Sequence, residues 1–308
     1  SWAERAWALP VLTCLAPSER FYQGRPRAHK KLTDWARQMV KQLRRWSPGR
    51  HLVVVADRSF AAISWLFELA QLPRTCLIVR LRPDARLFEP APPRTPKQTG
   101  RPRKVGPRRP NLSARAVDPQ TIWQRVTIPA WYGTGPRRVE ILSETAVWFH
   151  PGEPPLPIRW VLIRDPKGKF KTQALLCTDL KGAPTQIVKW FVLRWQLEVT
   201  FHEIREHLGV ETQRQWSDLA IQRTTPALLG LFSVVTLLAH QATRRRRLSA
   251  RQAAWYAKPR PTFSDALALV RRQIWQEECF HDVQSRTNGG KLSGRTRNRL
   301  LLALSYTP

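Results

Sequence analysis

Two carboxylates, Asp57 and Glu198, stand where they could bind metal ions. Asp57 ends a β-branched run (HLVVVAD), and Glu198 lies within a long amphipathic segment. Carboxylate oxygens are the ligands that Mg²⁺ prefers. Two such ions, held by carboxylates from different elements, can activate water or a 3′-hydroxyl for in-line attack on a phosphodiester. Both residues are therefore candidate catalytic and metal-binding residues.

Each carboxylate also has a structural interpretation, which stays open. An aspartate after a strand commonly caps the next helix, and a glutamate between two arginines on a helix commonly forms an ion pair. The charge of the chain favours the catalytic interpretation, because 52 Lys and Arg against 22 Asp and Glu leave a formal charge of +30. So much positive charge indicates a polyanionic partner.

Other kinds of site find little support in the sequence. It contains neither the GxSxG motif of serine hydrolases nor the phosphate-binding motifs GxxxxGK[ST] and GxGxxG. The four cysteines, at 14, 76, 177 and 279, form no CxxC pair, so we expect no zinc site or disulfide framework and favour the cytoplasm. The longest apolar stretch, Pro226 to Ala239, is too short to span a bilayer, and so we expect no membrane partner.

A strand–helix–strand unit is expected to position Asp57. Residues 51–57 are typical of a buried strand, residues 61–72 indicate a helix, and residues 75–81 (TCLIVRL) indicate a second strand. Because the crossover is long enough for parallel pairing, Asp57 would lie at the carboxyl edge of the sheet, where ligands commonly bind. Apolar residues also predict a helix over 31–46 and a strand over 7–15.

A basic, proline-rich segment follows at residues 90–115. It holds seven prolines and eight Lys or Arg residues but no acid, which is typical of an extended, mobile arm that buries no core. Its motif GRPRK, which contains Arg101, Arg103 and Lys104, resembles the core of an AT-hook, where arginine enters the minor groove of DNA. The alternative is an arm that only contacts phosphates.

Residues 123–179 contain five strand-like pieces separated by glycine and proline turns. This pattern predicts an antiparallel, β-rich insertion in an α/β core. Its aromatic residues are expected to pack in the interior rather than to stack on bases.

The helix predicted over 184–207 carries Glu198. Arg194, His202 and Arg205 recur with it at intervals of three or four and therefore share its face. Further helices are predicted over 216–239 and 263–275, with a basic run at 244–247 between them.

Two motifs in these segments resemble those of DDE transposases from bacterial insertion sequences. The spacing Phe191-(2)-Arg194-(3)-Glu198-(6)-Arg205 is similar to their Y-(2)-R-(3)-E-(6)-K signature, and the run VVVADRSF around Asp57 looks like their second-aspartate motif. The resemblance covers roughly residues 7–240. Arginine at 205 still supplies a cation for phosphate, whereas phenylalanine at 191 loses any hydroxyl contact to DNA.

The resemblance implies an RNase H-like α/β core with a β-rich insertion and C-terminal helices. It implies three carboxylates that bind two Mg²⁺ ions, or Mn²⁺, with Asp57 as the second acid and Glu198 as the third. The first acid would then precede Ser1, residues 7–15 would be the third strand, and this chain would be a truncated form that cuts DNA poorly. Arg194 and Arg205 would hold phosphates of double-stranded DNA, at transposon ends and target. A homodimer and a bacterial, nucleoid-associated location are also implied.

These expectations divide the chain into four segments. Residues 1–89 would be the first part of the core, and residues 90–178 the basic arm and insertion. Residues 179–240 would hold the helix with the third acid and a packing helix, and residues 241–308 would form a basic helical region.

Other readings of the same residues remain. Asp57 could be the first acid and Asp179 the second, although Asp179 also fits a turn before Pro184. The chain could instead be a non-catalytic, basic DNA-binding protein in which the carboxylates are structural, or an RNase H-like nuclease without strand transfer.

Overall fold

The structure is a computed structural model, and it describes residues 5–306 except 25, 27, 95–98, 244–246, 253–256 and 280–292. The chain forms two compact units. The sheet unit comprises Ala16–Trp195, and the helical unit comprises Ser1–Leu15 together with Gln196–Pro308. The boundary between them falls inside the predicted segment 179–240.

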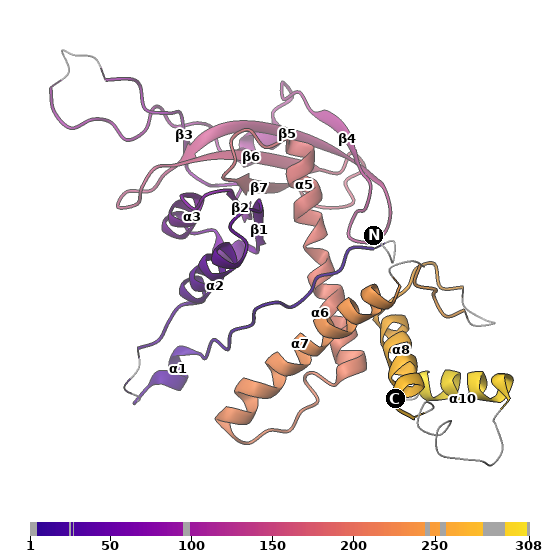
Figure 1. Cartoon of the computed structure of the whole chain (residues 1–308). Helices are drawn as coiled ribbons and strands as arrows, with labels where there is room; N and C mark the ends of the chain where they lie inside the picture. The colour runs from indigo at the N-terminus through magenta and orange to yellow at the C-terminus, as the bar shows by residue number, and fades with distance from the viewer. Residues whose placement is uncertain are drawn as a thin grey trace. The chain divides into compact units, whose positions relative to one another are not determined.

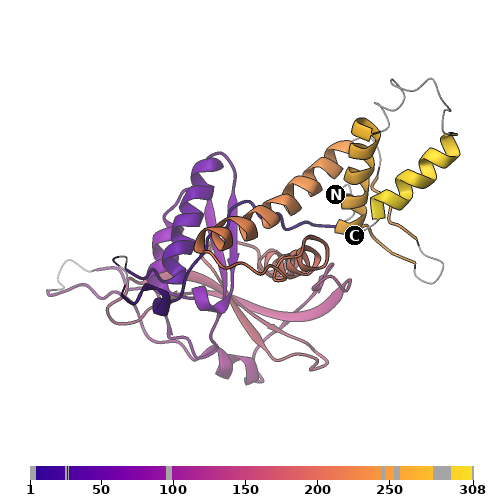
Figure 2. The same cartoon turned by 90° about the horizontal axis from the view of Figure 1, so that it is seen from below.

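A seven-stranded sheet is the centre of the sheet unit. Its strands are β1 (Leu52–Ala56), β2 (Thr75–Leu81), β3 (Leu87–Phe88), β4 (Gln124–Ile128), β5 (Arg137–Trp148), β6 (Leu156–Arg164) and β7 (Gln173–Cys177). They lie in the order β1-β2-β7-β6-β5-β3, with β4 also paired to β5. In Figure 2 the strands, coloured purple to pink, form a curled sheet. The predicted antiparallel strands are present, but β7 joins them to β2, so that they extend one sheet rather than form a separate one.

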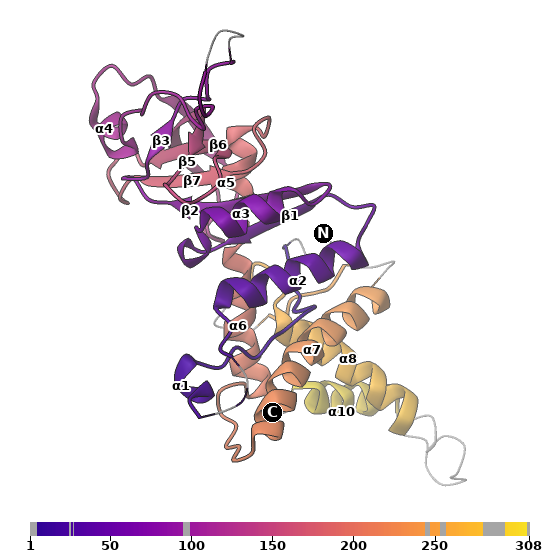
Figure 3. The same cartoon turned by 90° about the vertical axis from the view of Figure 1, so that its left-hand side faces the viewer.

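Helices cover both faces of the sheet near β1 and β2. The helices of this unit are α1 (Glu19–Tyr22), α2 (Leu32–Trp46), the 3₁₀ turn η1 (Arg58–Phe60), α3 (Ile63–Ala70), α4 (Leu112–Val117) and α5 (Pro184–Leu193). Trp65 and Leu66 of α3 pack on one face, and Ile187 and Phe191 of α5 pack on the other. Figures 1 and 3 show α3 beside β1 and β2. Because β1 and β2 pair in parallel, the predicted strand–helix–strand unit is confirmed.

The segment at 90–115 is only in part the extended arm that its composition predicts. Its C-terminal part folds back, since Glu89 N donates to Pro107 O at 2.9 Å and Gly106 N donates to Glu89 O at 2.8 Å. Arg109 pairs with Glu89 and Glu144, and Leu112 is 1% exposed in the core. Charge neutralisation by acids from outside the segment lets this basic stretch pack, which its own composition could not indicate. Figure 1 shows the described part of the loop extending from β3.

Replacement of Gly106 by alanine is expected to destabilise the base of this loop. A Cβ at Gly106 would lie 2.6 Å from Pro90 O and 2.9 Å from Glu89 Cβ, so the backbone would have to move. Overpacking of this kind costs about 1–3 kcal/mol, measurable as a lower thermal midpoint. Gly49→Ala is the matched control, because a Cβ there meets nothing within 4 Å. Equal stability of the two variants would contradict this account.

The helical unit is built from α6 (Trp195–Leu208), α7 (Asp218–Ala242), α8 (Phe263–Ile274), the π-helical turn η2 (Trp275–Cys279) and α10 (Gly294–Tyr306). Its core centres on Phe232 and Phe263, whose rings stack with centroids 4.3 Å apart. Ile204 of α6 packs in the same cluster. Of the basic run predicted at 244–247, residues 244–246 lie outside the described residues.

The strand predicted over residues 7–15 is wrong, because this segment has neither strand nor helix. It lies instead in the helical unit, where Trp7 packs on Phe232. The hydroxyls of Thr200 and Ser233 donate to the carbonyls of Ala8 and Pro10 at 2.8 and 2.7 Å. Pro10 has no backbone N–H for a strand ladder, and these side-chain hydrogen bonds satisfy the carbonyls in place of a sheet.

The apolar stretch 226–239 belongs to a longer helix than its composition suggests. Helix α7 has 25 residues and runs through Pro226. Among the described residues this longer helix is the one that could cross a membrane by its length and composition alone, although the stretch 226–239 within it is shorter than a membrane span. A third of its most apolar window (33%) is buried, and core helices of soluble proteins pass the same test.

Two of the cysteines that are far apart in sequence meet in the sheet. Cys76 of β2 and Cys177 of β7 are free, buried thiols with an Sγ–Sγ distance of 3.3 Å. Their mutual hydrogen bond and their burial raise the pKa of Cys177. Pairing of β2 with β7 creates this contact, and sequence spacing could not reveal it.

Candidate active site

Asp57 lies at the carboxyl end of β1, as predicted. Its Oδ1 accepts a hydrogen bond from Arg58 N at 2.9 Å, and it thereby caps η1. This is the structural role that the sequence left open, but it uses only one carboxylate oxygen. Within the described part of the chain, Oδ2 accepts no hydrogen bond, and the residue is exposed. One oxygen of Asp57 therefore remains available to a ligand.

The strand register places Asp57 beside Arg80. Ala56 pairs with Val79 in the parallel ladder, and Asp57 continues the strand with an extended ψ of 172°. Because side chains alternate along a strand, Asp57 shares the face of Val53 and Val55, which is the face covered by α5. Asp57, just after β1, and Arg80, near the end of β2, thus lie next to each other at one edge of the sheet.

Three arginines gather at this edge. Arg58, Arg80 and Arg82 line a cavity of about 190 Å³ that extends to the start of β7. Arg82 is held by Asp84, with hydrogen bonds of 2.8 and 2.6 Å, and these hydrogen bonds lower the pKa of Asp84. The guanidinium groups of Arg58 and Arg80 form no ion pair with any described residue. They are available to bind an anion such as a phosphate group.

Sequence reasoning missed Arg80 and Tyr132 as site residues. Tyr132, from the loop between β4 and β5, packs edge-on against Trp195 with ring centroids 5.8 Å apart. Burial raises the pKa of Tyr132, and the charges of Arg80 and Arg194 oppose this shift. A usable signal was present for Arg80, which is the one charged residue of the apolar strand TCLIVRL.

The helix predicted over 184–207 is present with an interruption of one residue. Helix α5 ends at Leu193 and α6 begins at Trp195, while Arg194 between them keeps near-helical angles of φ −52° and ψ −28°. Glu198 is exposed in the first turn of α6. It belongs to the helical unit, whereas Asp57 belongs to the sheet unit.

Two other positions of the helix motif have structural partners. Phe191 is 3% exposed and packs in the core between α5 and the sheet, so this position is an interior one. Arg205 pairs with Glu211, with an Nε–Oε2 distance of 2.8 Å and both side chains largely exposed. An exposed ion pair of this kind is weak, and a phosphate group could replace the glutamate.

Asp179 lies at the opposite edge of the sheet from Asp57. Strand β7 runs antiparallel to β2, so its carboxyl end is next to Cys76, whereas Asp57 is next to Arg80. At about 3.3 Å per residue, four residues of β2 separate the two acids by about 13 Å, far more than the roughly 4 Å between ions in a two-metal site. Asp179 Oδ1 accepts from Lys181 N at 2.9 Å and closes a turn. The strand topology therefore keeps Asp57 and Asp179, the alternative pair of catalytic acids, too far apart to share a two-metal site.

The residues of the predicted AT-hook, Arg101, Arg103 and Lys104, are exposed in the loop that follows β3. The preceding Gly100 has a φ of +94° and so turns the chain just before them. They lie apart from Asp57 in the sequence and form no ion pair within the described part of the chain.

The acidic residues fit Mg²⁺ by their chemistry, since Asp57 and Glu198 are exposed oxygen donors. Among the described residues, no group of three or more His, Cys, Asp or Glu side chains could hold a metal ion. Arg58 and Arg80 lie beside Asp57, and the acid Asp84 at the same edge is bound to Arg82. Within the described ranges, neither unit by itself therefore contains such a group of ligands.

No curated protein matches this chain. One family model matches its N-terminal part, which includes Asp57 and the three arginines of the sheet edge but ends before Glu198. Residues 1–137 match the family described as DDE superfamily endonuclease, and the match supports a nuclease of the DDE type.

Proposed function

We propose that this protein is a transposase of a bacterial insertion sequence, which cleaves DNA at the ends of the element and transfers the cut strand. The observation that carries the proposal is the exposed carboxylate of Asp57 beside Arg58 and Arg80, within the residues that match DDE superfamily endonucleases. A formal charge of +30 suits a DNA substrate. The spacing around Glu198, which is similar to the Y-(2)-R-(3)-E-(6)-K signature of DDE transposases, supports a transposase.

Each residue has a distinct role in this proposal. Asp57 and Glu198 would hold Mg²⁺ or Mn²⁺, which when bound supplies a Lewis acid for phosphodiester chemistry. Arg58 and Arg80 would bind phosphate oxygens beside Asp57, and Arg194 would act with them, since its charge and that of Arg80 both act on Tyr132. Arg205 would exchange Glu211 for a phosphate group.

Outside this site, the loop after β3 would contact DNA through Arg101, Arg103 and Lys104. These exposed side chains would enter a minor groove or bind flanking phosphates. These DNA contacts would not depend on whether Asp57 and Glu198 bind a metal ion. Their loss would weaken binding without changing the reaction.

The full chain is expected to cut duplex DNA slowly but measurably in Mg²⁺, because Asp57 and Glu198 are two of the three carboxylates that the family resemblance implies, and EDTA is expected to abolish the cleavage. Incubation of pre-cut ends with a target plasmid should also give joined products, which gel electrophoresis separates from nicked circles. Nicks without joined products would indicate a nuclease that lacks strand transfer. Tight DNA binding without any cleavage in Mg²⁺ or Mn²⁺ would indicate a non-catalytic DNA-binding protein.

A further inference from the structure

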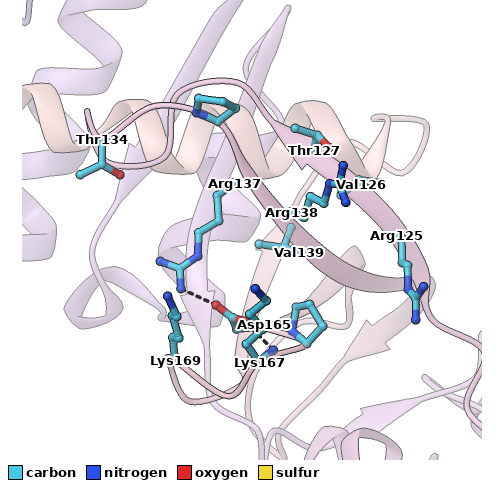
Figure 4. Close-up of a pocket in the computed structure, with 12 residues that line it drawn as sticks. Arg125, Val126, Thr127, Thr134, Arg137, Arg138, Val139, Asp165, Lys167 and Lys169 are labelled. Atoms are coloured by element: carbon cyan, nitrogen blue, oxygen red, sulfur yellow. Dashed lines mark hydrogen bonds and ion pairs between the residues drawn. The ribbon is translucent and has the colours of Figure 1, made fainter.

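A cleft lies between β4, the start of β5 and the turn that joins β6 to β7. It has a volume of about 810 Å³, and Figure 4 shows the side chains that line it. Five of them are cationic and one is acidic, namely Arg125, Arg137, Arg138, Lys167 and Lys169 against Asp165. The cleft therefore has a strong excess of positive charge.

The single acid of the cleft is fully engaged. Asp165 is 9% exposed, pairs with Arg137, and accepts a hydrogen bond from Lys167 N at 2.7 Å. The hydrogen bond from Arg137 lowers the pKa of Asp165, which keeps this ion pair intact at neutral pH. Figure 4 shows the Arg137 side chain directed toward Asp165. Asp165 thus holds Arg137 and the Lys167 backbone in place. Within the part of the chain that the structure describes, it forms no ion pair with the other cations of the cleft.

Aromatic rings and a second acid hold two of the arginines in place. The Arg137 guanidinium lies over the Trp131 and Phe170 rings, 5.4 and 5.1 Å from their centroids. Arg125 bonds to the buried Glu140 at 3.1 Å, and its side chain is 87% exposed. These contacts hold the two guanidinium groups in position before a ligand binds. The cleft wall that they form is therefore preorganised for binding.

Three cations of the cleft have no partner of their own. The side chains of Arg138, Lys167 and Lys169 are exposed and form no hydrogen bond or ion pair with the described residues. Unpaired side chains of the same charge repel one another at this distance. A bound anion would relieve the repulsion. These three side chains are therefore the ones that a ligand would engage.

We infer that this cleft binds backbone phosphates of duplex DNA, as a contact surface separate from Asp57. Arginine, lysine and threonine side chains are the usual donors to phosphate oxygens, and Thr127 and Thr134 lie among the cations. The cleft offers no unoccupied aromatic ring for a base, since Arg137 covers Trp131. It would therefore read the backbone and not the sequence. The choice of DNA among polyanions rests on the proposed function.

The test compares two triple variants of the full chain. Arg138→Ala/Lys167→Ala/Lys169→Ala removes the unpaired cations of the cleft, and Arg20→Ala/Arg45→Ala/Arg50→Ala removes the same charge from exposed positions elsewhere in the sheet unit. Affinity for two unrelated duplexes is measured in EDTA over a range of salt concentrations. The cleft variant should bind both duplexes about tenfold more weakly, and the slope of log affinity against log salt should fall by roughly two to three.

The control variant should change affinity much less than the cleft variant. Wild-type binding by the cleft variant, or an equal loss in both variants, would overturn the inference. So would binding of inorganic phosphate that the cleft variant loses while its DNA affinity stays at the wild-type value, because the cleft would then be a small-anion site. Unchanged thermal midpoints, expected because all the replaced side chains are exposed, exclude misfolding as the cause.

Failure of this inference and failure of the proposed function give different results. If the wild type binds DNA through the cleft but never cuts it, the cleft stands and the transposase proposal fails. If the wild type cuts DNA and the cleft variant binds like the wild type, only the cleft inference fails.

Discussion

The Asp57→Asn variant is expected to lose DNA cleavage by roughly a hundredfold or more and to keep its affinity for duplex DNA. A neutral amide oxygen is a much weaker ligand for Mg²⁺ than an ionised carboxylate, because it carries no charge. Asparagine caps a helix as well as aspartate does, so the hydrogen bond from Arg58 N that starts η1 should persist. The substitution therefore removes charge without removing the local fold. Cleavage of labelled duplex in Mg²⁺ and binding in EDTA measure the two effects separately.

Asp179→Asn is the matched control for this experiment. Asp179 also follows a strand and also caps a turn through a backbone N–H, in this case that of Lys181. It lies at the other edge of the sheet and should be dispensable for cleavage. An equal loss of cleavage in both variants would restore Asp179 as a catalytic acid. Full cleavage by Asp57→Asn would leave Asp57 with only its capping role.

The Glu203→Ala variant is expected to lose about 3–5 kcal/mol of stability in the helical unit. Glu203 accepts from Arg5 Nη1 and Nη2 at 3.0 and 3.2 Å, and also from Phe263 N at 3.1 Å. The ion-paired side chains of Arg5 and Glu203 are only 11% and 8% exposed. Alanine would remove the Glu203 carboxylate from a buried guanidinium and leave a buried N–H without its acceptor. Hydrogen exchange of α6 and α8 amides would report the loss.

Glu206→Ala provides the comparison on the same helix. Glu206 is exposed, and its replacement should change stability by no more than about 0.5 kcal/mol. A Glu203→Ala variant as stable as Glu206→Ala would show that the Arg5 ion pair contributes nothing net. DNA affinity of the sheet unit's cleft should be the same in both variants, because neither residue belongs to it.

Local patterns in the sequence predicted most elements of the sheet unit. The β-branched run before Asp57 forms β1, the apolar run TCLIVRL forms β2, and the helical spacing of residues 31–46 gives α2 at Leu32–Trp46. These signals are short-range, since side-chain periodicity and crossover length are properties of adjacent residues. The same reasoning placed Asp57 at the carboxyl edge of parallel strands, and the register of β1 with β2 confirms that placement.

Pairings between distant segments were beyond the reach of those patterns. The run at 7–15 is as apolar as a strand, but no strand pairs with it, and its carbonyls bond to Thr200 and Ser233 instead. The segment at 90–115 packs because Glu144, from β5, pairs with Arg109. In both cases the partner lies far along the chain. Local composition therefore predicted the wrong structure, a strand at 7–15 and a fully extended arm at 90–115.

The sequence by itself determined the charge of the chain, the position of Asp57 at a strand end and the helix that carries Glu198. Only the tertiary structure decided which cations accompany Asp57, that Asp179 belongs to the opposite edge, and that Arg138, Lys167 and Lys169 share a cleft. The physical reason is that strand order and direction fix which side chains meet at an edge. Those are set by burial of both sheet faces and by ladder hydrogen bonds between residues up to about a hundred positions apart, as for Cys76 and Cys177 (|i−j| = 101).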